Sequence, residues 1–176
     1  MTPQLLLAAT GVYLALLLAA AYFTRATPRR VAGALAGGAA VAVVGVGVEF
    51  LCQSLGFWRY PSDDRPYGPP LMYPAVVLMF ALLPLVGWRV TRRFGWRGQA
   101  VFLAAVTAVG TLRDYLIAGQ VMGLIVLAPG VGTVLVDAAC WAGLTALAQA
   151  VMRLVAGPAR SDPLARREAR AASGRR

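Results

Sequence analysis

The stretch from Val48 to Pro70, VEFLCQSLGFWRYPSDDRPYGPP, decides how this chain folds. It begins inside an apolar segment that carries one carboxylate, Glu49, and then breaks into a loop rich in aromatic residues and proline. A charged side chain inside a bilayer is costly, so a protein that keeps one usually pairs it or uses it. The stretch therefore predicts an apolar helix that ends in a loop, with Glu49 held at membrane depth.

The composition of the whole chain is typical of a protein that crosses a membrane several times. The chain has 176 residues, of which 59% are hydrophobic and 14% charged, and its mean hydropathy is +0.67. A soluble domain carries about 25% charged residues, whereas a membrane-spanning helix needs about 20 apolar residues. Because the alternating pattern of a β-barrel is absent, we predict an all-α, polytopic transmembrane bundle, with residues 1–156 as its single domain.

Apolar runs predict five membrane spans. They cover approximately 4–23, 31–55, 71–88, 98–118 and 131–155. The segment that follows the fourth run is too long for one crossing and too short for two with a turn. Because Ala128–Gly132 interrupts it, we expect a short interfacial or re-entrant helix over 120–127 before the last span. Six spans are the alternative.

The arginine distribution predicts the orientation. All 17 basic residues are arginine, which indicates coding bias from a GC-rich genome. We expect a multi-pass protein of the bacterial inner membrane. With the N-terminus outside, 14 of the 17 lie on the cytoplasmic side, in the first loop, in a basic loop over 89–97 and from Arg153 onward, as the positive-inside rule requires. Residues 157–176 form a basic cytoplasmic tail that is either a disordered anchor or attaches to anionic lipid headgroups. The net charge of +10 is then a topology signal and predicts no nucleic-acid partner.

Two further expectations concern side chains near the membrane interfaces. Trp88, Phe94 and Trp96 should form an aromatic belt at the inner interface. Cys52 and Cys140, counted along their helices from the outer face, fall at different depths, which argues against a disulfide between them.

Four ionisable residues are predicted to meet at one depth. Counting about 1.5 Å per residue from the outer ends of the spans places Glu49, Arg113, Asp114 and Asp137 in the outer half of the membrane. Each carboxyl shares a helical face with small or polar residues, and such faces point into a bundle. Three ionised carboxylates beside one guanidinium would bury a net double negative charge. We therefore expect Arg113 to pair with one carboxylate and at least one other carboxyl to stay protonated.

This cluster has three interpretations. Acid–base enzymes use a protonated acid beside an ionised base, proton-coupled transporters use the same pair, and buried charges also fix helix register. The candidate catalytic residues are Glu49, Arg113, Asp114 and Asp137. The candidate ligand-lining residues are Trp58, Tyr60, Tyr67, Thr111 and Trp141. The chain has no histidine or lysine and only two cysteines, so we expect no metal and no cofactor.

Three parts of the chain together form a pattern: Glu49, the run Gly56-Phe57-Trp58-Arg59-Tyr60, and the run Tyr67-Gly68-Pro69-Pro70. It resembles small bacterial membrane proteins of carotenoid biosynthesis, the membrane-bound lycopene cyclases and related hydratases. These have an intramembrane Glu, a Gly-x-Trp-x-aromatic loop and a Gly/Pro start to the next helix. The resemblance covers roughly 25 residues and implies that Glu49 is the acid. The paired-acid motif with which those cyclases begin the following helix is replaced here by Met72-Tyr73-Pro74.

Two functions of different class stay open. In the first, the chain is a membrane-embedded acid–base enzyme that protonates an isoprenoid or another lipid, with aromatic walls around the resulting cation. In the second, it is a non-catalytic bundle whose buried charges are structural. Such a bundle would be a partner subunit, a lipid binder or a small transporter, as a homo- or hetero-oligomer.

Overall fold

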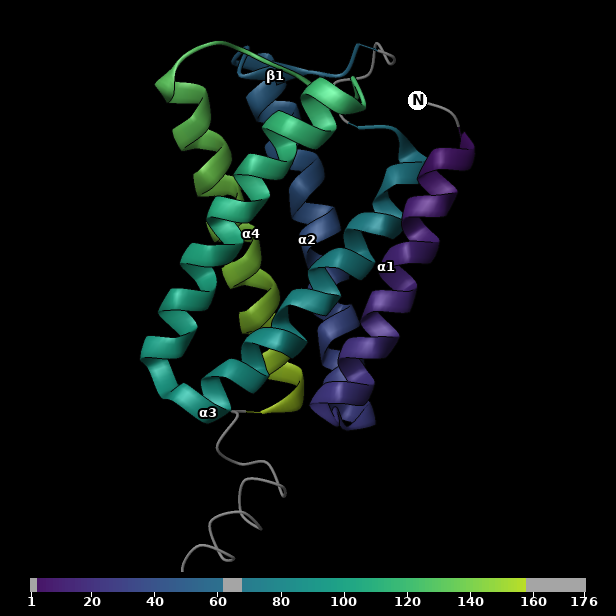
Figure 1. Cartoon of the computed structure of the whole chain (residues 1–176), viewed down its shortest axis with the longest axis vertical. Helices are drawn as coiled ribbons and strands as arrows, with labels where there is room; N and C mark the ends of the chain where they lie inside the picture. The colour runs from purple at the N-terminus through teal and green to yellow at the C-terminus, as the bar shows by residue number, and fades with distance from the viewer. Residues whose placement is uncertain (1–2, 62–67, 158–176) are drawn as a thin grey trace, which may run out of the picture.

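The computed structural model describes residues 3–61 and 68–157 (Figure 1). Within these ranges the helices are α1 (Pro3–Thr24), α2 (Pro28–Ser54), α3 (Tyr73–Arg113) and α4 (Val131–Ala156). Four helical stretches are long and apolar enough to cross a membrane. The predicted all-α class is thus confirmed. The predicted basic tail lies outside the described residues from position 158 onward.

The predicted count of five spans is not confirmed, because the third and fourth runs join in one helical stretch. This stretch consists of η1 (Pro70–Met72, 3₁₀), α3 and η2 (Asp114–Val121, a π-helix). Its 52 residues would extend about 78 Å if they were straight. Figure 1 shows that the chain instead doubles back, so that α3 has a first arm (73–94) and a second arm (96–113).

Gly95 makes this reversal. Its backbone angles, φ 67° and ψ −152°, lie in a region that is essentially restricted to glycine. The predicted loop over 89–97 is wrong, because the chain is helical on both sides of this residue. The Thr91 hydroxyl hydrogen-bonds the Gln99 side chain across the reversal, and Arg153 Nη2 donates to Gln99 Oε1 at 3.5 Å. Helical turns on both sides satisfy backbone groups that a long loop would leave unpaired.

The predicted interfacial or re-entrant helix over 120–127 is wrong as well. The helix ends before Gly123, which has φ 57°, and Val126–Leu127 then forms a short strand, β2. This strand pairs antiparallel with β1, Trp58–Arg59. A strand two residues long is stable here only because the earlier loop offers it a backbone partner, which no local pattern could reveal. We call this end of the bundle the strand end and the end with Gly95 the kink end (Figure 1).

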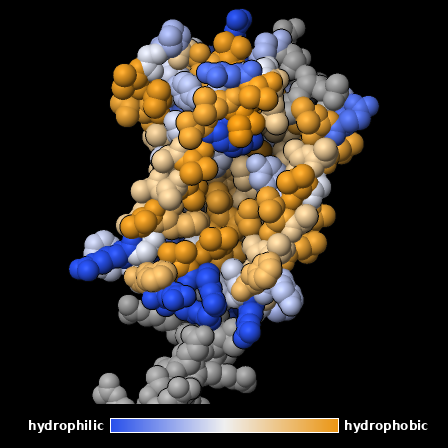
Figure 2. Space-filling view, viewed as in Figure 1, coloured by the Kyte–Doolittle hydropathy of each residue, from blue (hydrophilic) through white to orange (hydrophobic). Residues whose placement is uncertain are grey.

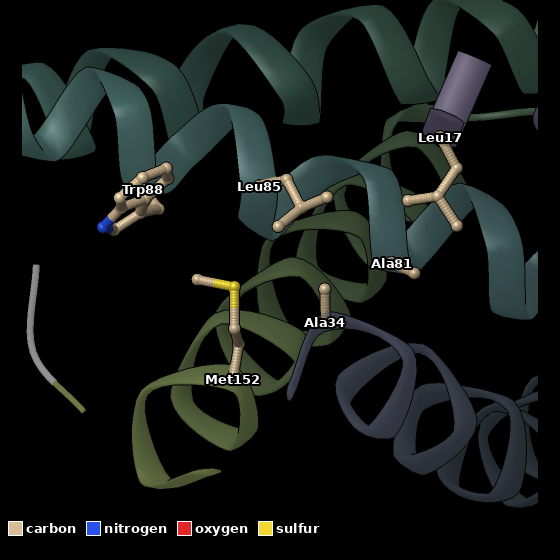
Figure 3. Close-up of a cluster of buried hydrophobic side chains, with 6 residues drawn as sticks. All are labelled: Leu17, Ala34, Ala81, Leu85, Trp88 and Met152. Atoms are coloured by element: carbon tan, nitrogen blue, oxygen red, sulfur yellow. The ribbon is translucent and has the colours of Figure 1, made fainter. Parts of the chain in front are cut away.

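All four helices meet in a hydrophobic cluster toward the kink end (Figure 3). The cluster consists of Leu17, Ala34, Ala81, Leu85, Trp88 and Met152. Trp88 is only 1% exposed, so its predicted place in an interfacial aromatic belt is wrong. The Arg30 guanidinium lies 4.5 Å from the centre of the Trp88 ring, and that of Arg92 lies 5.3 Å from it. The two cations stabilise the indole inside the bundle through cation–π contacts.

α1 is the most peripheral helix. It packs mainly against α3, and only 11% of its apolar window is buried. Next to it, α2 approaches α4 closely, because a β-carbon at Gly37 would lie 2.6 Å from the Ala148 carbonyl oxygen. Tight packing among α2, α3 and α4 and loose packing of α1 leave room for a cavity at the strand end.

Candidate functional site

A cavity of about 560 Å³ lies at the strand end, with walls from all four helices. The four predicted ionisable residues, Glu49, Arg113, Asp114 and Asp137, all line it. Figure 2 shows a hollow in this face of the molecule, with hydrophobic residues over its floor and hydrophilic residues at its upper end. The hollow lies on the flank of the bundle between hydrophobic surfaces.

Asp114 is held by two donors. Arg113 Nη1 lies 2.5 Å from Asp114 Oδ1, and Trp141 Nε1 donates to Asp114 Oδ2 at 2.8 Å. The ion pair predicted for Arg113 is therefore present. The Trp141 indole stacks on Phe80 with ring centroids 5.5 Å apart, and a β-carbon at Gly110 would overlap that indole. Charge-assisted bonds on both oxygens stabilise Asp114 as a carboxylate and fix its position.

Asp114 also begins the wide helical turn η2. In this turn the backbone N–H of Met122 donates to the Ile117 carbonyl five residues earlier, at 2.8 Å. Ile117, Ala118 and Met122 line the cavity. Such π-helical turns are rare and occur frequently at functional sites. No sequence pattern pointed to this turn, because the eight residues of η2 are too few to show a period of their own.

Glu49 is bound by three donors from later parts of the chain. Its Oε1 accepts from Tyr60 Oη at 3.2 Å, and its Oε2 accepts from the Gly68 backbone N–H at 2.7 Å and from Tyr73 Oη at 2.8 Å. Burial and the neighbouring Glu49 charge raise the pKa of the Tyr60 phenol well above its ordinary value, so this phenol remains a donor at neutral pH. Glu49 therefore connects the end of α2 to the loop before α3 and to the first turn of α3. Sequence reasoning missed Gly68 and Tyr73, because no spacing rule relates them to position 49.

Asp137 is the carboxyl whose hydrogen bonding is incomplete. It is 6% exposed, and its Oδ2 is buried without a hydrogen-bond partner among the described residues. The Thr111 hydroxyl lies beside this carboxyl. Buried polar atoms in native structures almost always have a partner. The polar group of a ligand would supply one.

The remaining predicted residues divide into three groups. Trp58, Tyr60 and Trp141 line the cavity, and the indole N–H of Trp58 is buried without a partner among the described residues. Thr111 is described but does not belong to the lining. Tyr67 lies outside the described residues. No group of three or more metal-ligating side chains with suitable geometry occurs in the described ranges.

Cys52 and Cys140 lie together, although their depths counted from the sequence differ. Both belong to the side-chain cluster around Trp58 and Tyr60, and both are free thiols. The depth count assumed helices parallel to the membrane normal. Figure 1 shows that α2 and α4 cross at an angle, so residues at different counts reach the same level.

The chain matches no protein-family model, no curated protein and no solved structure.

Proposed function

We propose that this chain is an integral protein of the bacterial inner membrane with an acid–base site for an isoprenoid or another apolar lipid. One observation carries the proposal: an incompletely bonded carboxyl, Asp137, and a fixed carboxylate, Asp114, share a cavity with largely apolar walls. The resemblance of the Glu49 region to membrane-bound lycopene cyclases favours an isoprenoid as the substrate.

The proposed arrangement has five crossings, with the N-terminus and the strand end outside. Each arm of α3 then crosses once. Support comes from the arginines of the described ranges. At the kink end are Arg25, Arg29, Arg30, Arg89, Arg92, Arg93, Arg97 and Arg153. The described part of the strand end has two arginines, Arg59 and Arg113, and Arg113 lines the cavity. The positive-inside rule therefore places the arginine-rich kink end in the cytoplasm. A reporter fused after the last residue should be active only in the cytoplasm, and activity on the outer side alone would reverse the orientation.

The chemistry we propose begins with a proton on Asp137. Transfer of this proton to an alkene carbon uses the π electron pair to form a C–H bond and leaves a carbocation. The Asp114 carboxylate and the faces of Trp141 and Phe80 would stabilise this cation electrostatically. Loss of a neighbouring proton to Asp137 regenerates the acid and gives a double-bond isomer or a ring of unchanged mass. Capture by water, with its extra proton returned to Asp137, gives a product heavier by one water.

Glu49 is the acid that the family resemblance implies, and it remains the competing assignment. Both of its oxygens already accept hydrogen bonds from the chain, whereas Asp137 Oδ2 has no partner among the described residues. We therefore assign proton donation to Asp137 and loop anchoring to Glu49. The substitutions Asp137→Asn and Glu49→Gln distinguish the two assignments, because each removes one titratable proton and preserves the side-chain shape.

The first experiment tests whether the cavity holds an apolar molecule. Gly45 lines the cavity, and a β-carbon there would meet nothing within 4 Å, so Gly45→Phe should fill the space without a backbone clash. Gly47 on the same helix is exposed and equally open, and Gly47→Phe is the matched control. After extraction in native lipid nanodiscs, mass spectrometry should find a bound lipid or isoprenoid in the wild type and in Gly47→Phe but not in Gly45→Phe. Equal amounts in all three proteins would refute the site.

The second experiment tests the reaction. Cells that make isoprenoids would express the wild type, Asp137→Asn or Glu49→Gln at equal levels. Lipid profiles should show an isomer or a hydrated product with the wild type and with Glu49→Gln, and neither product with Asp137→Asn. Loss of the product with Glu49→Gln alone would transfer the acid role to Glu49.

A structural role is the second candidate function, and the hydrogen bonds of two carboxyls favour it. Both oxygens of Glu49 and both oxygens of Asp114 already accept hydrogen bonds, most of them from distant segments. On this interpretation the chain is a non-catalytic subunit, lipid binder or small transporter. An unchanged lipid profile, together with a tightly associated second protein, would support it.

A further inference from the structure

The charge of the cavity is unbalanced. Three carboxyls line it, and Arg113 is the only basic residue among the described lining residues. Arg113 is committed to Asp114, and the donors on Glu49 are two phenols and a backbone amide, which carry no positive charge. Asp137 Oδ2 has no hydrogen-bond partner in the described part of the chain. The cavity thus has an excess of negative charge and repels anionic headgroups.

The cavity also has a direction. Its ionisable residues lie near the strand end, whereas Val41, Phe80 and Leu144 line it farther toward the middle of the bundle. Leu144 follows Asp137 by seven residues on α4, which corresponds to about 10 Å along the helix. A molecule with its polar group at Asp137 would therefore place an apolar body about 10 Å long against these side chains.

Aromatic walls suit a positive charge at the polar end. Trp58, Tyr60, Phe80 and Trp141 all line the cavity, and the faces of such rings attract cations. The hollow lies on the hydrophobic flank of the bundle (Figure 2), the surface that would face lipid if the helices cross a membrane. These features together describe a ligand that partitions into the membrane and carries a positive charge.

We infer that the cavity binds lipophilic cations, of the class of a protonated amine on an apolar chain, with the ammonium group donating to Asp137. Asp137 is ionised in this complex, whereas the acid–base reaction uses its protonated form. An ammonium N–H would then supply the partner that Asp137 Oδ2 lacks, as a charge-assisted hydrogen bond. The inference rests on the proposed function for the location of the site but does not require turnover. It adds a selectivity for positive over neutral and negative headgroups.

The experiment compares three ligands of equal chain length: dodecylamine, dodecanol and dodecyl phosphate. Binding is measured to the full chain in zwitterionic nanodiscs, with empty nanodiscs as the background. The wild type should bind dodecylamine saturably, about tenfold to a hundredfold more tightly than dodecanol, and should show no saturable binding of dodecyl phosphate. Equal affinity for amine and alcohol, or preference for the phosphate, would overturn the inference without any variant.

Variants then assign the selectivity to a residue. Asp137→Asn should bind dodecylamine and dodecanol equally, whereas Gly47→Phe, an exposed change on α2 outside the cavity lining, should keep the preference for the amine. A retained preference in a monodisperse Asp137→Asn protein would overturn the assignment. If Asp137→Asn loses amine selectivity while lipid profiles never depended on the protein, the cation site stands and the acid–base function fails. If Asp137→Asn instead alters the lipid profile but keeps its preference for the amine, the acid–base function stands and the cation site fails.

Discussion

Glu49 provides the most quantitative test, because its three donors come from three separate places in the chain. Replacing Glu49 by alanine removes the acceptors of Tyr60 Oη, Tyr73 Oη and the Gly68 N–H together. Hydrogen bonds to a charged partner contribute about 1.5–3 kcal/mol each. Because the two phenols can turn to other acceptors, we expect the Glu49→Ala variant to lose about 4–6 kcal/mol of unfolding free energy.

Glutamine at the same position should be much less harmful. Its carbonyl oxygen can accept from Gly68 and Tyr73, and its amide can donate to Tyr60, because a hydroxyl both donates and accepts. Hydrogen bonds to the neutral glutamine amide are weaker than those to a carboxylate. The substitution also removes a charge whose burial is costly, which offsets part of that loss. We therefore expect Glu49→Gln to lose about 1–2 kcal/mol.

Unfolding by SDS in mixed micelles, followed by circular dichroism, measures these differences. Ser54→Ala is the control, because Ser54 is exposed and bonds only within its own helix, to the Phe50 carbonyl at 2.7 Å; its loss should stay within about 0.5 kcal/mol. If Glu49→Ala unfolds like the control, Glu49 does not anchor the loop. If Glu49→Gln is as unstable as Glu49→Ala, the site requires a carboxylate and the proposed exchange of bonds is wrong.

Three further predictions test the backbone and the packing. Gly95→Ala should lose about 1–3 kcal/mol of unfolding free energy in the same assay, because the space around Gly95 is open and only its backbone angles disfavour a side chain. A neutral effect would contradict the reversal at Gly95. Gly110→Val should lose at least about 1–3 kcal/mol by pushing against Trp141, while Gly143→Val, in open space, should be neutral; equal effects would argue against the contact. Mild oxidation should crosslink the Cys52–Cys140 pair, read as loss of two alkylation sites after denaturation, and full alkylation would place the thiols apart.

The all-α class, with helices long and apolar enough to cross a membrane, and the grouping of the charges were accessible from the sequence. Run length and apolar fraction are local properties, and the bilayer sets the length that a helix needs. The small-residue faces beside Glu49 and Asp137 follow from helical periodicity, which is also local. For this reason the four ionisable residues of one cavity could be named before any coordinate was known.

The partners of those charges were decided by the tertiary structure. Sequence spacing cannot show that Glu49 accepts from Gly68 and Tyr73, or that Asp137 is the carboxyl left incompletely bonded. The reversal at Gly95 and the β1–β2 pair also depend on segments distant along the chain. Local patterns determine which helices form and which face turns inward. Hydrogen-bond partners depend on where the helices cross, and packing among all four of them sets those crossings.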